Sequence, residues 1–258
     1  MTKQLLFYEK VTPITKQRHA AWAVDRSAGY GFAGAANSIP LMAVEFPSAA
    51  SEYPIVFTKA EEAALPAVVL GVDNDQNLYL DADGHWNARY VPAFVRRYPF
   101  VFTLTHEGEK FTLCIDEAFA GCDSSGKTGE RLFDDQGERT PFLDRMLDFT
   151  NNYQVEHRRT QELGKILLEL DLLEPMQAQI TLPSKEQRSL TGFFAVSRER
   201  LKKLDDAKLA QLVRSDALEL IYAHLASIRN FERLLDRLRT RAGGANGAGA
   251  KQPAEAGA

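Results

Sequence analysis

Alternation of apolar and polar residues in the first 120 positions predicts antiparallel β-strands. Residues 110–116, "KFTLCID", place Phe, Leu and Ile on one side and Thr, Cys and Asp on the other, which is the two-residue period of a half-buried strand. Together with residues 99–105 they predict a hairpin across "HEGE", and residues 66–72 and 77–84 predict a second one across "DNDQ". Two further strands are predicted at 41–46 and 52–59.

After residue 140 the apolar residues recur with the period of an α-helix. Thr140 is a favourable N-cap, and Pro141 suits the first helical position. The apolar residues that follow recur on one helical face: Phe142, Met146, Phe149 and Tyr153. Polar residues at 154–162 predict that this helix is either exposed midway or interrupted there. An apolar face then returns, and Pro175 is predicted to stop the helix.

The remaining sequence predicts two strands and two more helices. Residues 176–182 and 191–197 have the composition of strands and are separated by a polar link. Either Asp205 or Asp206 is predicted to cap the helix that follows. A longer helix from about Asp216 has one apolar stripe, with Phe231 beside it: Leu218, Ile221, Leu225, Ile228, Leu235 and Leu238. Such a stripe is typical of a helix packed on a core.

These elements predict an α+β fold, in which a mainly antiparallel β-sheet packs with a mainly helical C-terminal half. The β-rich half covers residues 1–120, and the helical half, with its small β element, covers 141–241. A flexible Gly/Ser/Asp loop at 121–140 is expected between them, and the two halves could also form one integrated domain. Residues 242–258 lack apolar content and are expected to be disordered.

Composition narrows the classes of protein that this chain can be. It has 258 residues, of which 45% are hydrophobic and 26% charged, and its net charge of −4 gives no general attraction to nucleic acid. The N-terminus has no signal-peptide core, and the sequence contains no run of about 18 apolar residues, so we expect a cytoplasmic protein without membrane insertion. Its two cysteines, Cys114 and Cys122, are expected to be reduced.

The segment "GCDSSGKT" matches the phosphate-binding pattern of nucleotide-binding loops. In that interpretation Gly121 and Gly126 shape the loop, Lys127 reaches the phosphates and Thr128 holds magnesium. A true loop of this kind leaves a buried strand and opens a helix. Here "IDEAFA" precedes the motif and turn-forming residues follow it, so a Gly/Ser loop without nucleotide is the favoured interpretation.

The sequence matches known metal-binding and catalytic motifs less well than it matches the nucleotide-binding pattern. The segment "DNDQNLYLDADG" imitates a calcium loop, but Leu78 stands where the turn glycine belongs and Gly84 where the bidentate Glu belongs. The five histidines are scattered, without the spacing of a zinc motif, and no Gly-x-Ser-x-Gly elbow occurs. We therefore expect no metal and no cofactor, and assign no catalytic residue.

The stretch "YVPAFVRRYPFVF" is the most informative candidate site. Pro92 is predicted to begin a short helix that ends before Pro99. Its adjacent arginines, Arg96 and Arg97, would then point about 100° apart. One can pair near the sheet, with Asp116 or Glu117 as partners, and the other can face solvent or a ligand. Two interpretations stay open: a structural arginine–acid clamp, which we favour, and an anion site beside Trp86, Tyr90 and Tyr98.

Four blocks of the chain, in order, resemble the bacterial SapC family. They are "LPAVVLGVDNDQNLYLDADGHWNARYVPAFVRRYPF", "RLFDDQGERTPFL", "GFFAVSRERLKKL" and "LELIYAHLASIRNF". The family takes its name from a surface-layer-associated gene, so the resemblance implies a link to surface-layer or nutrient-uptake systems. It brings no catalytic residues, and it draws attention to the candidates inside its blocks: Trp86, Tyr90, Arg96, Arg97, Tyr98, His224 and Asn230.

The sequence supports two hypotheses about function. The first is a cytoplasmic accessory or binding protein without catalysis of its own, whose partner protein or small ligand is not specified. The second is an enzyme or small-ligand binder whose site is assembled around Arg96 and Arg97, with Asp116, Glu117 and His224. Convergence of these side chains on one cavity would favour the second hypothesis, and separate pairing of each in the core would favour the first.

Overall fold

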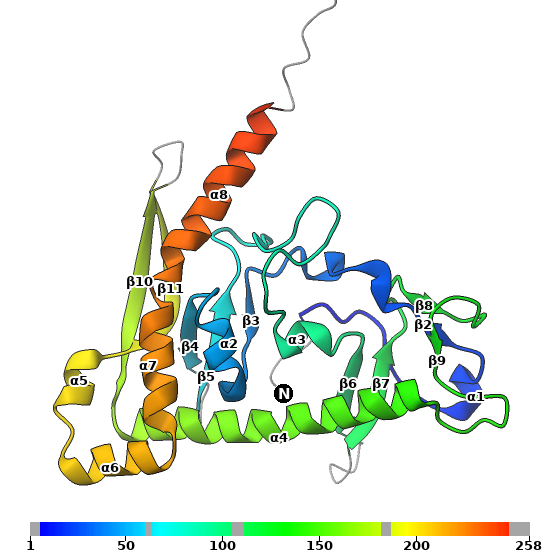
Figure 1. Ribbon diagram of the computed structural model, residues 1–258, viewed down its shortest axis with the longest axis horizontal. Coiled ribbons are helices and arrows are strands. Elements are labelled where there is room, and N and C mark those ends of the chain that lie inside the picture. The colour runs from blue at the N-terminus through cyan, green and yellow to red at the C-terminus, as the bar shows by residue number, and fades with distance from the viewer. Residues whose placement is uncertain (1–5, 60–62, 105–110, 182–186, 248–258) are drawn as a thin grey trace, which may run out of the picture.

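A computed structural model describes residues 6–59, 63–104, 111–181 and 187–247 of the chain (Figure 1). The strands are β1 (Val11–Pro13), β2 (Ala23–Val24), β3 (Ser38–Pro40), β4 (Ile55–Lys59), β5 (Ala64–Val69), β6 (Phe100–Leu104), β7 (Phe111–Asp116), β8 (Cys122–Asp123), β9 (Glu130–Arg131), β10 (Leu173–Thr181) and β11 (Gln187–Val196). The α-helices are α1 (Lys16–His19), α2 (Phe46–Ala49), α3 (Ala93–Arg96), α4 (Pro141–Glu169), α5 (Arg198–Lys202), α6 (Asp206–Arg214), α7 (Ala217–Ser227) and α8 (Asn230–Gly247). The 3₁₀ turns are η1 (Arg26–Ala28), η2 (Gly31–Ala33) and η3 (Ala43–Glu45). The predicted α+β class is confirmed.

The largest sheet contains strands from both predicted halves of the chain. Its order is β10-β11-β4-β5-β3, and its pairs are antiparallel. The hairpin β10–β11 joins the sheet where Phe194 lies opposite Phe57 of β4. The small β element predicted for the second half is therefore an extension of the N-terminal sheet.

Two smaller sheets complete the β structure. One has the order β1-β7-β6, and its β6–β7 hairpin confirms the pairing predicted across "HEGE". The other has the order β8-β2-β9 and draws two of its strands from the segment predicted as a flexible loop at 121–140. That prediction needs correction, because β2 holds both β8 and β9 by backbone hydrogen bonds.

Two predicted strands are wrong for local reasons. Residues 41–46 form η3 and the start of α2, because the Glu45 carboxylate accepts the backbone N–H of Met42 and Pro47 lies in the first helical turn. Residues 77–84 form turns rather than pairing with β5, whose neighbours are β4 and β3. The buried Asn77 accepts the N–H of Tyr79 and donates to Ala33, and such side-chain bonds compete with a strand ladder.

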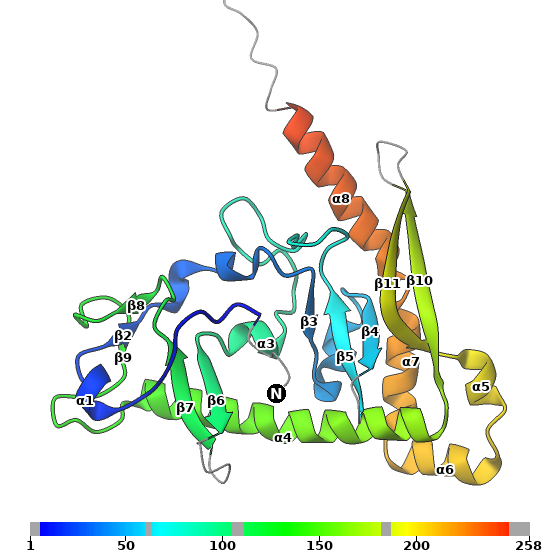
Figure 2. The same cartoon turned by 180° about the vertical axis from the view of Figure 1, so that it is seen from behind.

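Helix α4 lies along one side of the molecule, beneath two of the sheets (Figures 1 and 2). Thr140 caps it as predicted, by accepting the N–H of Leu143. The sequence predicts that α4 is either exposed or interrupted at its polar centre. The helix is continuous there, so the exposed alternative is correct. Gly164 lets it approach β5, because a Cβ there would lie 1.9 Å from the carbonyl oxygen of Ala64.

The end of α4 differs from the prediction. The helix ends at Glu169, and Asp171 follows with φ of 50°, so the chain turns before Pro175. Pro175 lies inside β10, which is the outermost strand of its sheet. An edge strand tolerates proline because the missing N–H is not needed there. The cap predicted at Asp205 or Asp206 is Asp205, which accepts the N–H of Lys208.

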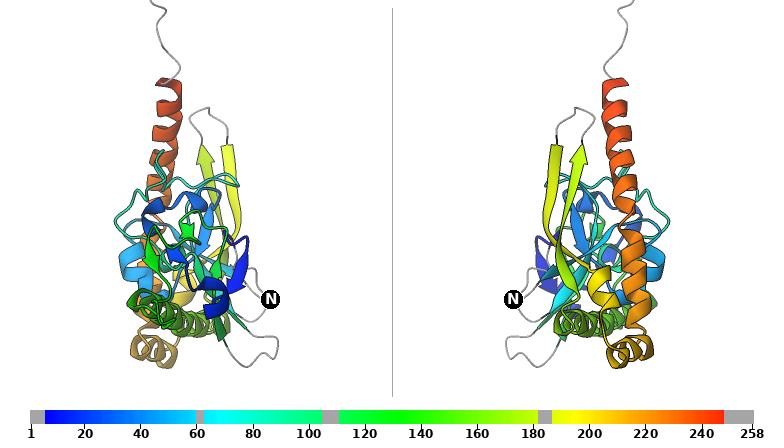
Figure 3. Two further views of the ribbon diagram at one scale, coloured as in Figure 1. Left: turned by 90° about the vertical axis from the view of Figure 1, so that its right-hand side faces the viewer. Right: turned by 90° about the vertical axis from the view of Figure 1, so that its left-hand side faces the viewer.

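The predicted long C-terminal helix is two helices, α7 and α8, which form an upright column beside the β10–β11 hairpin (Figure 3). The break falls between Ser227 and Asn230, whose side chains bind backbone groups of the sheet region. Ser227 accepts the N–H of Ile55, and Asn230 donates to the carbonyls of Ala50 and Tyr53. Helix α8 continues to Gly247, which corrects the disorder predicted from residue 242; residues 248–258 lie outside the described residues.

His224 joins α7 to β4 and β11, two strands that pair with each other at one position. Its Nε2 accepts the N–H of Val196 on β11, and its Nδ1 donates to the carbonyl of Ile55 on β4, at 3.0 and 2.9 Å. Because Nε2 must accept, the imidazole is neutral in the fold. The ring is completely buried, and this burial lowers the pKa of His224 to about 4.

The protein should lose stability as the pH falls from about 6.5 to 4. The folded state resists protonation of His224, whereas a histidine in the unfolded chain accepts a proton near pH ~6.5. The loss from this residue is up to about 3 kcal/mol of unfolding free energy, complete below pH ~4. Urea denaturation across this pH range measures the unfolding free energy.

Two variants separate His224 from other titrating groups. His224→Gln should flatten the pH dependence, while the exposed His85→Gln should leave it unchanged. An equally steep pH dependence in His224→Gln would contradict the assignment.

Candidate functional site

The two adjacent arginines of α3 lie in different surroundings. Arg97 is 1% exposed and points into the core, whereas Arg96 is half-buried. Both contact α4, where they meet rings one helical turn apart: the guanidinium of Arg96 lies 5.3 Å from the ring centroid of Phe149, and that of Arg97 lies 4.5 Å from that of Tyr153. This fits the predicted divergence of neighbouring helical side chains.

Arg97 is enclosed by aromatic rings from three separate segments. Its guanidinium lies 4.5 Å from the ring centroids of Phe94 and Tyr153 and 5.8 Å from that of Tyr8. Ring faces carry negative partial charge, and a buried cation above them gains about 2 kcal/mol or more per favourable contact. Arg97 therefore joins the N-terminal segment, α3 and α4 around one charge.

Arg96 lies between two rings at the surface of the same junction. It donates Nε–H to the carbonyl of Val91, makes a long 3.4 Å contact from Nη2 to the Tyr90 hydroxyl, and has its guanidinium 5.7 Å from the Tyr90 ring centroid. The carbonyl oxygen of Arg96 accepts from Arg26. Within the described residues, most of its guanidinium N–H donors thus have no recorded acceptor.

A buried carboxylate, Glu45, fixes the entrance of α3. One of its oxygens accepts from the Tyr90 hydroxyl and from the N–H of Ala93, both at 2.7 Å, and the other accepts the N–H of Met42 at 2.8 Å. Burial raises the pKa of Glu45, and the hydrogen bonds from Ala93 and Met42 oppose this shift. Glu45 thereby orients Tyr90 and the first turn of α3.

These groups surround a cavity of about 230 Å³ between η3, α3 and α4, which we call the α3–α4 cavity. Its polar lining comes from Glu45, Tyr90, Arg96, Asn152, Tyr153 and Glu156, and its apolar lining from Met42, Val44, Ala93 and Phe149. Glu156 is paired with Arg159, at 2.7 Å. A cation, two carboxylates, two tyrosine side chains and an amide therefore line one small hollow.

Tyr153 contributes a polar atom that the protein does not satisfy. The residue is 4% exposed, and its hydroxyl has no hydrogen-bond partner among the described residues. Burial raises the pKa of Tyr153, so the phenol is protonated and can donate. An unsatisfied buried hydroxyl costs about 1–3 kcal/mol, and an interior water that accepts from it is one explanation of such a group.

The acidic residues predicted as arginine partners have other roles. Asp116 is completely buried and accepts from the N–H groups of Glu9 and Lys10 and from the Tyr98 hydroxyl. Glu117 forms ion pairs with Lys10 and Arg18 and lies 3.3 Å from Nε2 of the buried His19, and the hydrogen bond from Arg18 helps to lower the pKa of Glu117 to about 2. Both carboxylates anchor the N-terminal segment to β7, and neither lines the α3–α4 cavity.

The remaining aromatic and helical candidates form hydrogen bonds inside the protein. Trp86 donates its indole N–H to Tyr53, whose hydroxyl in turn donates to the carbonyl of Tyr90. His224 and Asn230 join α7 and α8 to the sheet, as described above. Of the predicted site residues, Tyr90 and Arg96 line the α3–α4 cavity, while Arg97 packs behind it against Tyr153.

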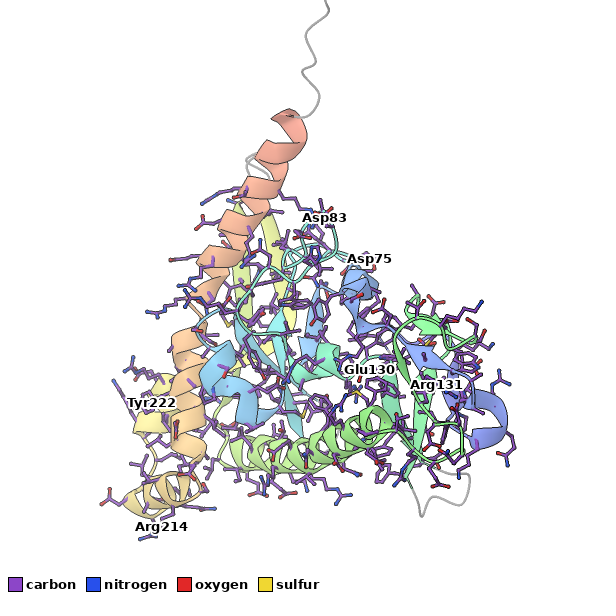
Figure 4. The ribbon with its side chains drawn as sticks, turned by 45° about the vertical axis from the view of Figure 1, so that its right-hand side comes forward. Asp75, Asp83, Glu130, Arg131, Arg214 and Tyr222 are labelled. Carbon is purple, nitrogen blue, oxygen red and sulfur yellow. The ribbon has the colours of Figure 1, made fainter. Side chains whose placement is uncertain are left out.

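The segment Gly121–Thr128 does not have the geometry of a nucleotide-binding loop. The N–H groups of Ser125, Lys127 and Thr128, which would face a phosphate, donate to the carboxylate of Asp123. These bonds, together with one from the Ser125 hydroxyl, lower the pKa of Asp123 to about 2. Thr128 is followed by β9 rather than by a helix (Figure 4, where Glu130 and Arg131 of β9 are labelled). Asp123 thus occupies the position that a bound phosphate would need.

An exposed turn gathers possible metal ligands. Asp81, Asp83 and His85 bring ligand atoms within 4.8 Å of one another. The turn explains the arrangement, because the Asp81 carboxylate accepts the N–H groups of Asp83 and His85. This is the local hydrogen bonding that aspartate forms in turns without a metal.

The comparison with known families agrees with the resemblance of the four sequence blocks to SapC. A family model, that of SapC, matches residues 14–234. The chain belongs to the SapC family. The comparisons with curated proteins and with solved structures found no match. The residues matched to the SapC family include the whole lining of the α3–α4 cavity. In the part of the chain that the structure describes, no helix is long and apolar enough to cross a membrane.

Sequence reasoning missed several residues of this SapC site. Glu45 was assigned to a strand, and Tyr153 to an ordinary apolar stripe. Asn152 and Glu156 lie in or beside the polar centre of α4, for which the sequence predicts either an exposed surface or an interruption. That polar stretch was the available signal, because a helix that carries Asn and Glu next to buried aromatic residues can present both to one cavity.

Tyr153→Phe should leave the free energy of unfolding unchanged or raise it by about 1 kcal/mol, because it removes a buried hydroxyl that has no partner among the described residues. The chemically identical change Tyr98→Phe should lower it by about 1–2 kcal/mol, because it removes a hydrogen bond to buried Asp116. Urea denaturation of both variants measures the difference. Equal losses would show that the Tyr153 hydroxyl is satisfied.

Proposed function

We propose that this SapC protein is a binding protein without catalysis of its own, and that it binds a small carboxylic acid in the α3–α4 cavity. The observation that carries the proposal is the position of Arg96 on the lining of the hollow, where most of its guanidinium N–H groups have no acceptor among the described residues. Tyr153 also lines the hollow, but its hydroxyl is covered by protein atoms. A carboxylate can accept from the guanidinium.

The surroundings of Arg96 favour a planar anion. The rings of Tyr90 and Phe149 hold the guanidinium between them, so its orientation is largely set before a ligand arrives. A guanidinium held in this way can meet a carboxylate with two parallel hydrogen bonds. Phe149, Met42 and Val44 offer apolar contacts to the rest of the ligand.

The volume of the cavity limits the ligand. At about 230 Å³ it lies below the ~300–1,000 Å³ of common ligand pockets. It has the volume of roughly eight water molecules at ~30 Å³ each. A small acid with a short apolar part fits this volume, and a nucleotide does not.

The alternative, an enzyme with a site around the arginines, is supported less well. Glu45 has the raised pKa of a general acid or base, but both of its oxygens already accept hydrogen bonds from Met42, Ala93 and Tyr90. A general base needs a free oxygen within reach of the substrate. The carboxylate therefore serves better as a structural anchor than as a reacting group.

The wider context stays a prediction. A cytoplasmic location, a protein partner and a link to surface-layer or nutrient-uptake systems rest on the sequence and on the family name. A small-acid binder fits such a link as a sensing or carrying component. The proposed cavity gives these predictions a molecular starting point that can be tested with purified protein.

Ligand-observed NMR with acetate, pyruvate and benzoate tests the proposal. At least one of these carboxylates should bind the wild-type protein saturably. Arg96→Gln should weaken that binding about tenfold or more, because a hydrogen bond to a charged group contributes about 1.5–3 kcal/mol. Tyr153→Phe should change that binding less than twofold, because the hydroxyl that it removes is covered by protein atoms.

Arg145→Gln is the matched control. Arg145 also lies beside a ring, that of Phe142, and pairs with Glu130, but it does not line the cavity. The Arg145→Gln variant should bind the carboxylate as tightly as the wild type does. Absence of binding by all three acids, or equal binding of the neutral acetamide and acetate, would refute the proposal.

A further inference from the structure

A second and larger hollow lies on the opposite side of the molecule from α4, between α8 and the loop of residues 78–87 (Figure 1). Its volume is about 630 Å³. Three arginines of α8 line it at intervals of four residues: Arg233, Arg237 and Arg241. We call it the α8 groove. Asp83, labelled in Figure 4, belongs to this loop.

The three arginines are held by neutral groups. Arg233 donates to the carbonyl of Ser51 and Arg241 to the carbonyl of Asn77, while the guanidinium of Arg237 lies 4.2 Å from the ring centroid of Tyr79. Within the described residues, no ion pair is formed by any of these three arginines. Carbonyls and a ring orient the guanidinium groups, but they do not neutralise their charge.

Three of the carboxylates near the groove already have partners. Asp236 pairs with Arg239 at 3.0 Å, and Asp81 accepts the N–H groups of its own turn. Glu52, which lies near Tyr79, accepts the N–H of Arg89. With three arginines and two aspartates, the lining of the groove has a net charge of +1.

The spacing of the arginines indicates the shape of the ligand. Residues four apart on a helix lie about 6 Å apart along its axis, so the row extends for about 12 Å. Like charges at this spacing repel each other by a few tenths of a kcal/mol per pair. An anion with charge along its length would relieve this repulsion, and each phosphate offers about two charges and three acceptor oxygens to neighbouring guanidinium groups.

We propose that the α8 groove binds a small molecule with two or more phosphate groups. The two positions between Arg233 and Arg237 and between Arg237 and Arg241 lie about 6 Å apart along the axis, so they suit the two terminal phosphates of a triphosphate rather than two adjacent ones. Arg237 is central because it borders both positions and lies against the ring of Tyr79. This site is separate from the α3–α4 cavity, and Arg237 and Arg241 lie beyond the residues matched to the SapC family.

The test is a calorimetric titration with inorganic triphosphate at constant ionic strength. Triphosphate should bind the wild-type protein with saturable heat, and inorganic phosphate should bind at least tenfold more weakly. Arg237→Gln and Arg241→Gln should each weaken triphosphate binding at least tenfold. Thermal melts of both variants establish that they are folded.

Arg239→Gln is the matched control, since it removes the same charge from the same helix but affects an arginine paired with Asp236 outside the lining. It should change the affinity less than twofold. The proposal is overturned if the folded wild-type protein shows no saturable binding of triphosphate. It is also overturned if Arg239→Gln weakens binding as much as Arg237→Gln, which is the result of unspecific surface charge, or if citrate binds as tightly as triphosphate.

Discussion

The buried guanidinium of Arg97 is the interaction on which the arrangement of this molecule depends. A charge that is 1% exposed can be tolerated only where its surroundings replace water. Here the rings of Tyr8, Phe94 and Tyr153 surround it, and they come from the N-terminal segment, α3 and α4. Because the three segments meet at this one group, the position of α3 against α4 is set by it.

The α3–α4 cavity is a consequence of that placement. Arg96 follows directly from the position of Arg97, because adjacent residues of a helix diverge by about 100°. It is thereby brought against Phe149, one turn before Tyr153 on α4. Glu45 completes the arrangement by binding Tyr90 and the first turn of α3. The packing of Arg97 in the core thus places Arg96 where it can bind a ligand.

Local patterns predicted much of the fold and little of the site. The β6–β7 hairpin, the cap at Thr140 and the divergence of the two arginines follow from short-range rules and are present in the structure. Asp116 and Glu117, predicted as arginine partners, bind the N-terminal segment, which spacing along the chain did not indicate. Contacts such as that between Arg97 and Tyr153 join distant parts of the chain, and spacing along the sequence carries no signal for them.

The two halves of the chain are more closely joined than their compositions indicate. The β10–β11 hairpin extends the N-terminal sheet, and His224 binds backbone groups of β4 and β11 where these strands pair at a single position. The polar residues of the last family block therefore secure the join between the halves. The cavity lies where α4 crosses from one sheet to the other, so this join also supports the site.

A double-mutant cycle between Arg97 and Tyr153 tests the central claim most directly. The free energies of unfolding of wild type, Arg97→Met, Tyr153→Leu and the double variant are measured by urea denaturation. If the guanidinium and the ring stabilise each other in the core, the coupling energy is about 1–2 kcal/mol. Additivity of the two single changes within about 0.5 kcal/mol would contradict the account.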